Sequence, residues 1–294
     1  MSESKRRSFA ARLARKALIS APGVFDGISA RIADRLGFEA LYMTGYGVVA
    51  SHLGLADAGI ATYSDMVARV EIIAGLTATP LVADGDTGYG GLLNVDHTVR
   101  GYERAGAVAI QIEDQEFPKK CGHMLGRRVV PLEDMVARIR VASDVRSDAD
   151  FKIIARTDAR TTLGLDEALR RGEAYAKAGA DLLFIESPES VAEMERIGRT
   201  FDTPLVANMV EGGRTPILDR KELERIGYRL AIFPALGFLS AGAAMESAYR
   251  SLQQRGSSVG VDTALYPFQD FSKLMGFDAI SEFDRKYRDK EPVK

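Results

Sequence analysis

The chain of 294 residues contains a single cysteine, Cys121, so no disulfide can form within it. Secreted chains usually pair their thiols, and one unpaired cysteine therefore favours a reducing compartment, which we predict to be the cytoplasm. A chain of this length can bury roughly three quarters of its unfolded surface. A stable core therefore needs no disulfide.

Net charge is also nearly absent, because 39 basic residues are balanced by 41 acidic residues. This balance gives no electrostatic footprint for nucleic acid or for a membrane surface. Long apolar runs are missing too, and none approaches the roughly 20 residues that span a bilayer. Residues 1–20 lack the apolar stretch of a signal peptide and favour an amphipathic first helix, with a transit peptide as the alternative. We therefore predict a small-molecule partner.

Histidine is scarce, and the three histidines lie far apart in the sequence: His52, His97 and His123. With only one cysteine beside them, they give no cluster suited to a structural zinc ion.

The cysteine lies within Lys119-Lys120-Cys121-Gly122-His123, and Arg127 and Arg128 follow. Positive charge near a thiol favours its reactive thiolate form, and a neighbouring glycine lets a substrate approach closely. A lone cysteine is more often a small buried hydrophobe. This segment, however, is too polar for a core strand, and Pro118 and Pro131 bracket an unusually long connection. We predict a functional loop.

From Leu18 onward, short apolar runs alternate with amphipathic segments. The predicted strands are Leu18–Pro22, Ala40–Met43, Pro80–Ala83, Ala107–Ile112, Lys152–Ala155, Leu182–Ile185, Pro204–Ala207 and Leu230–Phe233. The predicted helices are Ile28–Leu36, Ser64–Gly75, Asp96–Ala105, Leu132–Val145, Leu165–Ala178, Val191–Arg199, Arg220–Ile226 and Leu239–Gln253. This alternation predicts an α/β fold, a (β/α)8 TIM barrel over residues 1–255, with a doubly wound sheet as the alternative. Residues 256–294 would form a C-terminal helical extension.

Polar residues follow six of the predicted strands, where a barrel places its catalytic groups. They are Tyr42-Met43-Thr44-Gly45, Asp84-Gly85-Asp86, Glu113-Asp114, Arg156-Thr157-Asp158, Glu186-Ser187 and Asn208. One charged strand end is usually a solvated turn, but six on one rim are hard to explain by stability alone. Asp84, Asp86 and Glu113 offer the oxygen ligands that Mg²⁺ prefers, although Asp-Gly-Asp is also an ordinary turn.

The cysteine segment together with Asp84-Gly85-Asp86-Thr87-Gly88-Tyr89-Gly90 resembles the isocitrate lyase and phosphoenolpyruvate mutase superfamily, from about Leu18 onward. The resemblance implies a barrel enzyme that uses Mg²⁺, or Mn²⁺ in its place, on 2-oxo or 2-hydroxy acids through an enolate-like intermediate. In this family the phosphonate-forming mutases generally lack the cysteine. Its presence favours a carbon–carbon lyase, in which Cys121 would protonate the departing acid.

The resemblance also implies individual roles. Asp84 would bind the metal directly, and three carboxylates would hold metal-bound waters: Asp57, Asp86 and Glu113. The catalytic residues would be Cys121, Arg156, His123, Glu186 and Tyr42. The residues that bind a dicarboxylate substrate would be Tyr42, Thr44, Gly45, Gly122, Arg156, Asn208 and Leu239.

Two departures from the family pattern bear on the substrate. Leu239 stands where isocitrate and methylisocitrate lyases carry an arginine, and Tyr46 stands near a position where the methylisocitrate branch has glycine. Both favour an alkyl-substituted malate, as in the dimethylmalate lyase branch, unless Leu239 only packs its helix. Methylisocitrate cleavage and oxaloacetate decarboxylation or hydrolysis remain alternatives, as does a binding protein without turnover.

The segment after Gly256-Ser257-Ser258 carries apolar stripes at helical spacing. They consist of Phe268, Phe271, Leu274, Met275, Ile280, Phe283 and Tyr287. A complete barrel already has its helices, so these stripes need another surface. The resemblance implies a homotetramer, a dimer of helix-swapped dimers, and the alternative is that the stripes fold back on their own barrel.

Overall fold

The computed structural model describes residues 2–15, 17–122, 124 and 126–288. The chain divides into two compact units, residues 1–238 and 239–294, and each is described by itself. The division falls within helix α11 (Leu236–Arg255). The domain boundary predicted after residue 255 stays a prediction.

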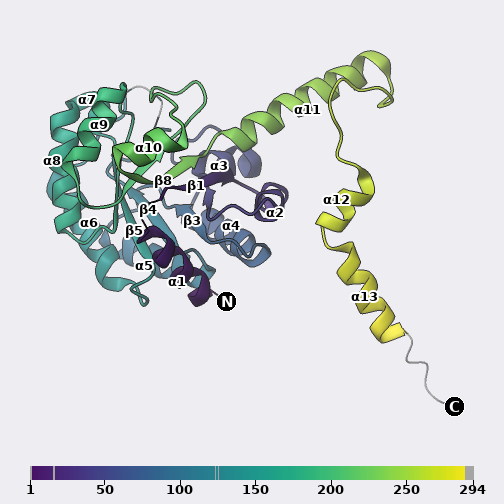
Figure 1. The fold of residues 1–294 in the computed structure, drawn as a ribbon, viewed down its shortest axis with the longest axis horizontal. Helices are drawn as coiled ribbons and strands as arrows, with labels where there is room; N and C mark the ends of the chain where they lie inside the picture. Colours follow the sequence, from purple (N-terminus) through teal and green to yellow (C-terminus); the bar gives the residue numbers. More distant parts are fainter. Residues whose placement is uncertain (1, 16, 123, 125, 289–294) are drawn as a thin grey trace. The chain divides into compact units, whose positions relative to one another are not determined.

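The first unit is a closed barrel of eight parallel strands in chain order, surrounded by helices (Figure 1). The strands are β1 Ile19–Val24, β2 Leu41–Met43, β3 Leu81–Asp84, β4 Ala109–Glu113, β5 Lys152–Thr157, β6 Leu182–Ile185, β7 Leu205–Asn208 and β8 Tyr228–Phe233. The barrel closes where β1 pairs with β8 through Ile19 and Leu230. Strands covered on both faces read as continuous apolar runs, which is why all eight were predictable. The (β/α)8 prediction is confirmed.

The helices of this unit are α1 Ser2–Leu13, α2 Gly27–Arg35, α3 Gly45–Leu53, α4 Tyr63–Leu76, α5 Leu92–Ala105, α6 Leu132–Val145, α7 Arg160–Leu163, α8 Leu165–Lys177, α9 Val191–Thr200 and α10 Arg220–Ile226. The predicted first helix is α1, whose Phe9 and Leu13 are buried in one apolar cluster with Ile19 and Leu230. Ile19 starts β1 and pairs with Leu230 in the first half of β8, so α1 covers the end of the barrel opposite the polar strand ends. This leaves the other rim free for the site.

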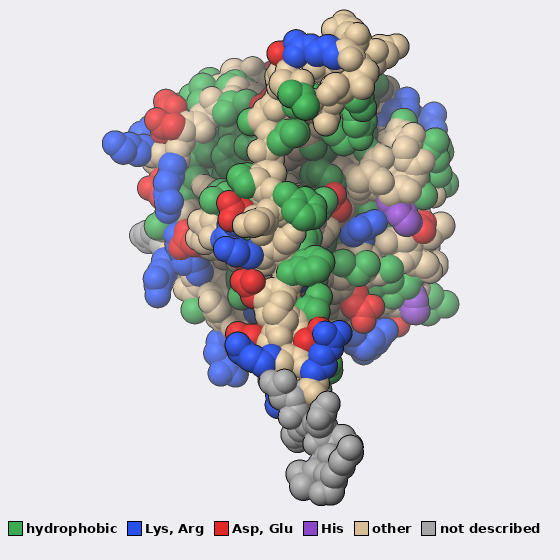
Figure 2. Space-filling model, turned by 90° about the vertical axis from the view of Figure 1, so that its right-hand side faces the viewer, with side chains coloured by type: hydrophobic (Ala, Val, Ile, Leu, Met, Phe, Trp, Pro, Cys, Tyr) green, Lys and Arg blue, Asp and Glu red, His purple; other side chains and the backbone are tan. Residues whose placement is uncertain are grey.

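The second unit contains most of α11, followed by α12 (Phe268–Leu274) and α13 (Phe277–Arg288). The helical spacing of its apolar residues is confirmed, but many of these side chains lie on its surface. Phe268 is 84% exposed and Phe283 is 63% exposed, and Figure 2 shows hydrophobic side chains between charged ones along this segment. None of the described helices combines the length and hydrophobicity that crossing a bilayer requires.

Candidate active site

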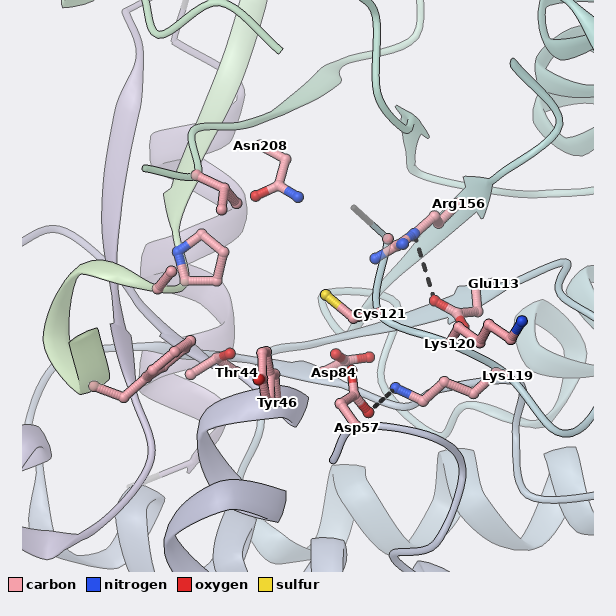
Figure 3. A pocket seen from close by; sticks show the side chains of 15 residues that line it. Thr44, Tyr46, Asp57, Asp84, Glu113, Lys119, Lys120, Cys121, Arg156 and Asn208 are labelled. Atoms are coloured by element: carbon pink, nitrogen blue, oxygen red, sulfur yellow. Dashed lines mark hydrogen bonds and ion pairs between the residues drawn. The ribbon is translucent and has the colours of Figure 1, made fainter. Parts of the chain in front are cut away.

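A small cavity opens among residues that follow the carboxyl ends of the strands. It measures about 60 Å³, so only a small ligand fits without movement. Its lining consists of Thr44, Tyr46, Asp57, Asp84, Glu113, Lys119, Lys120, Cys121, Gly122, Arg156, Asn208, Val210, Pro234, Ala235 and Phe238. Figure 3 shows the Cys121 sulfur pointing into the space between Asn208 and Asp84. Residues predicted from five strand ends and from the cysteine loop therefore meet at one place.

Four carboxylates and one lysine form the most charged wall of the site. Asp84 ends β3, Asp86 follows it, Glu113 ends β4, and Asp57 comes from the loop after α3. The Lys119 ammonium forms ion pairs with Asp57 and, at 2.6 Å, with Asp86. Burial opposes its charge, but the carboxylates of Asp86 and Asp57 raise the pKa of Lys119 well above its ordinary value. A positive charge thus already lies among the predicted metal-site residues.

Lys119 does not balance all of this acidity. Burial raises the pKa of Asp86 to about 6 and also raises the pKa of Asp84 and of Glu113. Glu113 Oε1 is buried and accepts no hydrogen bond from the described residues. A carboxylate in this position is stabilised by a further cation or by an ordered water.

The donor set fits Mg²⁺ held mainly through water. Within the described ranges, no group of three or more His, Cys, Asp or Glu side chains is arranged to hold a metal ion directly. Mg²⁺ keeps several of its waters and takes one or two carboxylates. The buried oxygens of Asp84 and Glu113 can serve such an ion, and the individual ligand roles expected from the sequence stay predictions.

Asp84 is held by three donors. Gly45 N and Gln111 Nε2 donate to it at 3.3 and 3.4 Å, and Asp86 N donates at 3.1 Å. A side chain at Gly45 would place its Cβ only 2.6 Å from Asp84 Oδ2, so glycine is required at the start of α3. These contacts fix the carboxylate expected to bind the metal.

Tyr42 lies behind this wall and does not line the cavity. Its hydroxyl donates to Gln111 Oε1 at 3.0 Å, and burial raises its pKa well above the ordinary value, so that it stays protonated. Sequence reasoning missed Gln111, which links Tyr42 to Asp84. The available signal was a polar residue between Ile110 and Ile112 in the middle of strand β4.

Arg156 projects from β5 and is surrounded by acids. Its Nε lies 3.4 Å from Glu113 Oε2, and its Nη2 lies 3.3 Å from Glu186 Oε2. Asn208 Nδ2 donates to the same Glu186 oxygen at 3.0 Å. Burial disfavours the charge, but Asp158, Glu186 and Glu113 raise the pKa of Arg156 well above its ordinary value. The predicted group of Arg156, Glu186 and Asn208 is thus assembled as one network.

The cysteine loop crosses the cavity. Cys121 N donates to Asp57 O at 3.2 Å, and the amide of Gln115 pairs with both backbone groups of Lys120 at 2.8 and 2.9 Å. A Cβ at Gly122 would clash with Arg156 Nη2, so only glycine lets the loop lie this close to the guanidinium. His123 lies outside the described residues.

Two of the basic residues near Cys121 are paired with acids in the structure, whereas Lys120 donates to Gly126 O at 3.5 Å and lines the cavity together with Cys121. Lys119 faces Asp57 and Asp86, and Arg128 Nε lies 2.7 Å from Glu116 Oε2. Of the basic residues expected around the thiol, Lys119 and Arg128 are thus directed to acids, because residues adjacent in a loop point in different directions.

An apolar wall stands opposite the charged one. It consists of Val210, Pro234, Ala235 and Phe238, with the ring of Tyr46 lying 5.2 Å from that of Phe238. Leu239, which the sequence placed at the substrate, does not line this cavity and is 47% exposed. Consecutive helical residues point about 100° apart, so the neighbour Phe238 takes the position in the wall.

Known proteins resemble the chain over nearly its whole length. Residues 9–253 match the family model described as phosphoenolpyruvate phosphomutase. The chain is 50% identical to 2,3-dimethylmalate lyase of Eubacterium barkeri, covering 94% of this chain and 95% of the relative. It is 39% identical to 2-methylisocitrate lyase of Aeropyrum pernix, covering 91% and 86% respectively.

Solved structures agree with this likeness. Oxaloacetate acetylhydrolase in complex with 3,3-difluorooxalacetate superposes with a TM-score of 0.92 at 36% identity, covering 99% of both chains. Phosphonopyruvate hydrolase, solved with oxalate and Mg²⁺, superposes at 0.87 with 29% identity, covering 96% and 99%. A metal ion therefore accompanies a small dicarboxylate in a related barrel.

Proposed function

We propose that this chain, which belongs to the phosphoenolpyruvate mutase and isocitrate lyase superfamily and is a carbon–carbon lyase, cleaves a 2-alkylmalate. The substrate would be a dicarboxylate such as 2,3-dimethylmalate, and the products would be pyruvate and propionate. The observation that carries the proposal is the single cavity in which the Cys121 thiol and the Arg156 guanidinium face an apolar wall. The 50% identity to 2,3-dimethylmalate lyase supports the same substrate class.

The metal in this proposal is Mg²⁺. Asp84 would hold it directly, and Asp57, Asp86 and Glu113 would hold it through water. When bound there, the ion would supply a Lewis acid toward the oxygens of the 2-hydroxy acid. The buried, unpartnered Glu113 Oε1 supports a cation at this place.

The charge and the protons of the reaction balance. When the C2–C3 bond breaks, the C2 hydroxyl gives its proton to solvent water and becomes the carbonyl of pyruvate, and the electron pair passes to the departing acid as an enediolate. Arg156 neutralises negative charge on the substrate oxygen. Cys121 donates its thiol proton to the enediolate carbon, which gives propionate. One proton is lost and one gained, so no co-reactant is consumed.

Two further substrates deserve a direct test, because the relatives include 2-methylisocitrate lyase and oxaloacetate acetylhydrolase. The experiment is a comparison of kcat/KM for 2,3-dimethylmalate, methylisocitrate, isocitrate and oxaloacetate with Mg²⁺. We expect the alkylmalate to give the highest value. A higher kcat/KM for methylisocitrate or oxaloacetate would show that the chain acts on that substrate instead.

The apolar wall gives a prediction on substrate preference. Phe238→Ala should lower kcat/KM for 2,3-dimethylmalate by about tenfold, while kcat/KM for unsubstituted malate changes little. The reason is that each buried methyl group contributes roughly 0.8 kcal/mol, and malate lacks both methyl groups. Steady-state kinetics on the two substrates measure the difference.

The neighbouring variant Leu239→Ala is the matched control, since that side chain lies outside the cavity lining. It should leave the preference for dimethylmalate over malate unchanged. If Leu239→Ala lost the preference and Phe238→Ala kept it, the wall would be misassigned.

The exposed stripes of α12 and α13 support the homotetramer expected from the sequence, arranged as a dimer of helix-swapped dimers. Light scattering at micromolar concentration should give four times the chain mass of 32.0 kDa. Phe268→Asp combined with Phe283→Asp should lower this mass, because charged groups oppose burial of the stripes. Asp278→Ala on α13 is the control and should leave it unchanged. A monomeric intact chain would instead favour helices that fold back on their own barrel.

A further inference from the structure

Asp158 joins Arg156, the proposed catalytic arginine, to Arg127, which follows Cys121 in the loop between Pro118 and Pro131. Asp158 follows β5 and is fully buried. Its Oδ2 accepts from Arg156 Nε and its Oδ1 accepts from Arg156 Nη2, each at 2.9 Å, and Arg127 Nη1 donates to the same Oδ1 atom. Two arginines from distant parts of the chain therefore share Asp158.

Arg127 lies in an unusual place for a loop residue. Its side chain is fully buried, although the neighbouring Arg128 side chain is 79% exposed. Its Nη2 donates to Thr161 Oγ1 at 2.5 Å, and its Nε donates to Met124 O at 3.1 Å. An arginine buried to this extent is costly unless every donor is satisfied, so its position is closely fixed.

The shared carboxylate is itself held rigidly. Asp158 N donates to Asp114 Oδ1 at 2.9 Å, and Asp114 also pairs with Arg171 Nη1 at 3.0 Å. Burial favours the neutral acid, but the guanidinium groups of Arg156 and Arg127 hold the pKa of Asp158 below its ordinary value. Asp158 is therefore a charged, fixed anchor for both arginines.

Gly122, the residue after Cys121 in this loop, lies near the same group of side chains. Ser187 Oγ donates to Gly122 O at 3.1 Å and lies 3.5 Å from Arg127 Nη2. Gly122 in turn lies against the Arg156 guanidinium, where no larger residue fits. Gly122 and Arg127, two separate points of the loop that carries Cys121, are thus both held close to Arg156.

We propose that Arg127 is a positioning residue, which acts through Asp158 and Ser187 to hold the Cys121 loop and the Arg156 guanidinium in one arrangement. The inference rests on the proposed function, since that function gives Cys121 and Arg156 their roles. Arg127 itself does not line the cavity. Its effect on the reaction is to bring the proton donor and the charge-neutralising group to the same substrate.

Hydrogen–deuterium exchange of the substrate-free protein tests the positioning directly. In Arg127→Met, the amides of residues 115–130 should exchange about tenfold faster or more, because the loop opens locally without its anchor. Helix α8 should keep its exchange rates. Arg128→Met, the adjacent exposed arginine, should match the natural protein throughout. Unchanged loop exchange in Arg127→Met, or an equal increase over the whole barrel, would overturn the proposal.

Two further variants separate anchoring from general stability. Arg127→Lys keeps the positive charge beside Asp158 but lacks the planar fork, so loop exchange should be intermediate. Thr161→Val removes only one acceptor of Arg127 and should raise loop exchange slightly without lowering the melting temperature. It keeps the test decisive if Arg127→Met fails to fold, because unchanged loop exchange in Thr161→Val would then contradict the anchor.

Kinetics supply a second readout. Arg127→Met should lower kcat for the alkylmalate by roughly 10- to 100-fold, the scale of a small misplacement of catalytic groups, with a much smaller change in KM. A rise in KM alone would contradict positioning of Cys121. If the natural protein cleaves no alkylmalate, the proposed function fails, whereas the exchange comparison still decides the role of Arg127.

Discussion

Replacing Cys121 with serine should reduce turnover of 2,3-dimethylmalate by roughly two to four orders of magnitude while KM changes little. This is the usual effect of removing a general acid or base. The serine hydroxyl is close in size to the thiol but is a far weaker acid. The side chain faces the cavity without being the main binding contact, since the charged and apolar walls surround it. Initial rates over a range of substrate concentrations measure both parameters.

Cys121 is the only cysteine, so thiol alkylation gives an independent check. Iodoacetamide should inactivate the natural protein in step with the modification of one thiol per chain, and substrate should slow the loss. The serine variant should be insensitive to the reagent. Near-normal turnover in Cys121→Ser would show that Cys121 is not the proton donor.

Replacing Asp84 with asparagine should abolish Mg²⁺ binding and reduce turnover by roughly three orders of magnitude or more. Charge stabilisation by a bound metal contributes several kcal/mol, and each factor of ten in rate corresponds to about 1.4 kcal/mol. Asparagine keeps the shape and most hydrogen bonds of Asp84 but removes its charge. Calorimetric titration with MgCl₂ measures the affinity apart from the reaction.

Asp96→Asn is a matched control for this variant. Asp96 lies on α5, where it is paired with Arg100 at 2.7 Å on the surface. It should keep both the Mg²⁺ affinity and the turnover of the natural protein. EDTA should inactivate the natural protein, and added Mg²⁺ should restore it. Full Mg²⁺ affinity in Asp84→Asn would show that the ion binds elsewhere.

The barrel was predictable because local patterns and the global fold agree. The strands are apolar runs and helices such as α2, α8 and α9 show a clear amphipathic period, so the order of elements predicted the topology. Helix α3 escaped prediction because Gly45 and Gly47 in its first turn disfavour a helix. Close packing against Asp84 and the Thr44 cap, whose Oγ1 accepts from Gly47 N at 3.4 Å, stabilises it nonetheless.

The candidate site was predictable in many of its members but not in its pairings. Parallel strands in chain order end on one rim, so Asp84, Glu113 and Arg156 had to come close. The ion pair of Lys119 with Asp57 joins residues 62 positions apart, and no local pattern reveals it. Phe238 and Leu239 illustrate the same limit, since the helix predicted from Leu239 begins at Leu236 and the sequence pattern did not show which of the two side chains lines the cavity.

The central claim is the cleavage of an alkylmalate with protonation of the departing carbon. Proton NMR of 2,3-dimethylmalate incubated with the protein and Mg²⁺ in D₂O tests it most directly. We expect pyruvate and propionate in equal amounts, with a single deuterium at C2 of propionate, because the Cys121 thiol exchanges with solvent before it donates. Dimethylmalate that remains intact, while oxaloacetate or methylisocitrate is consumed under the same conditions, would contradict the claim.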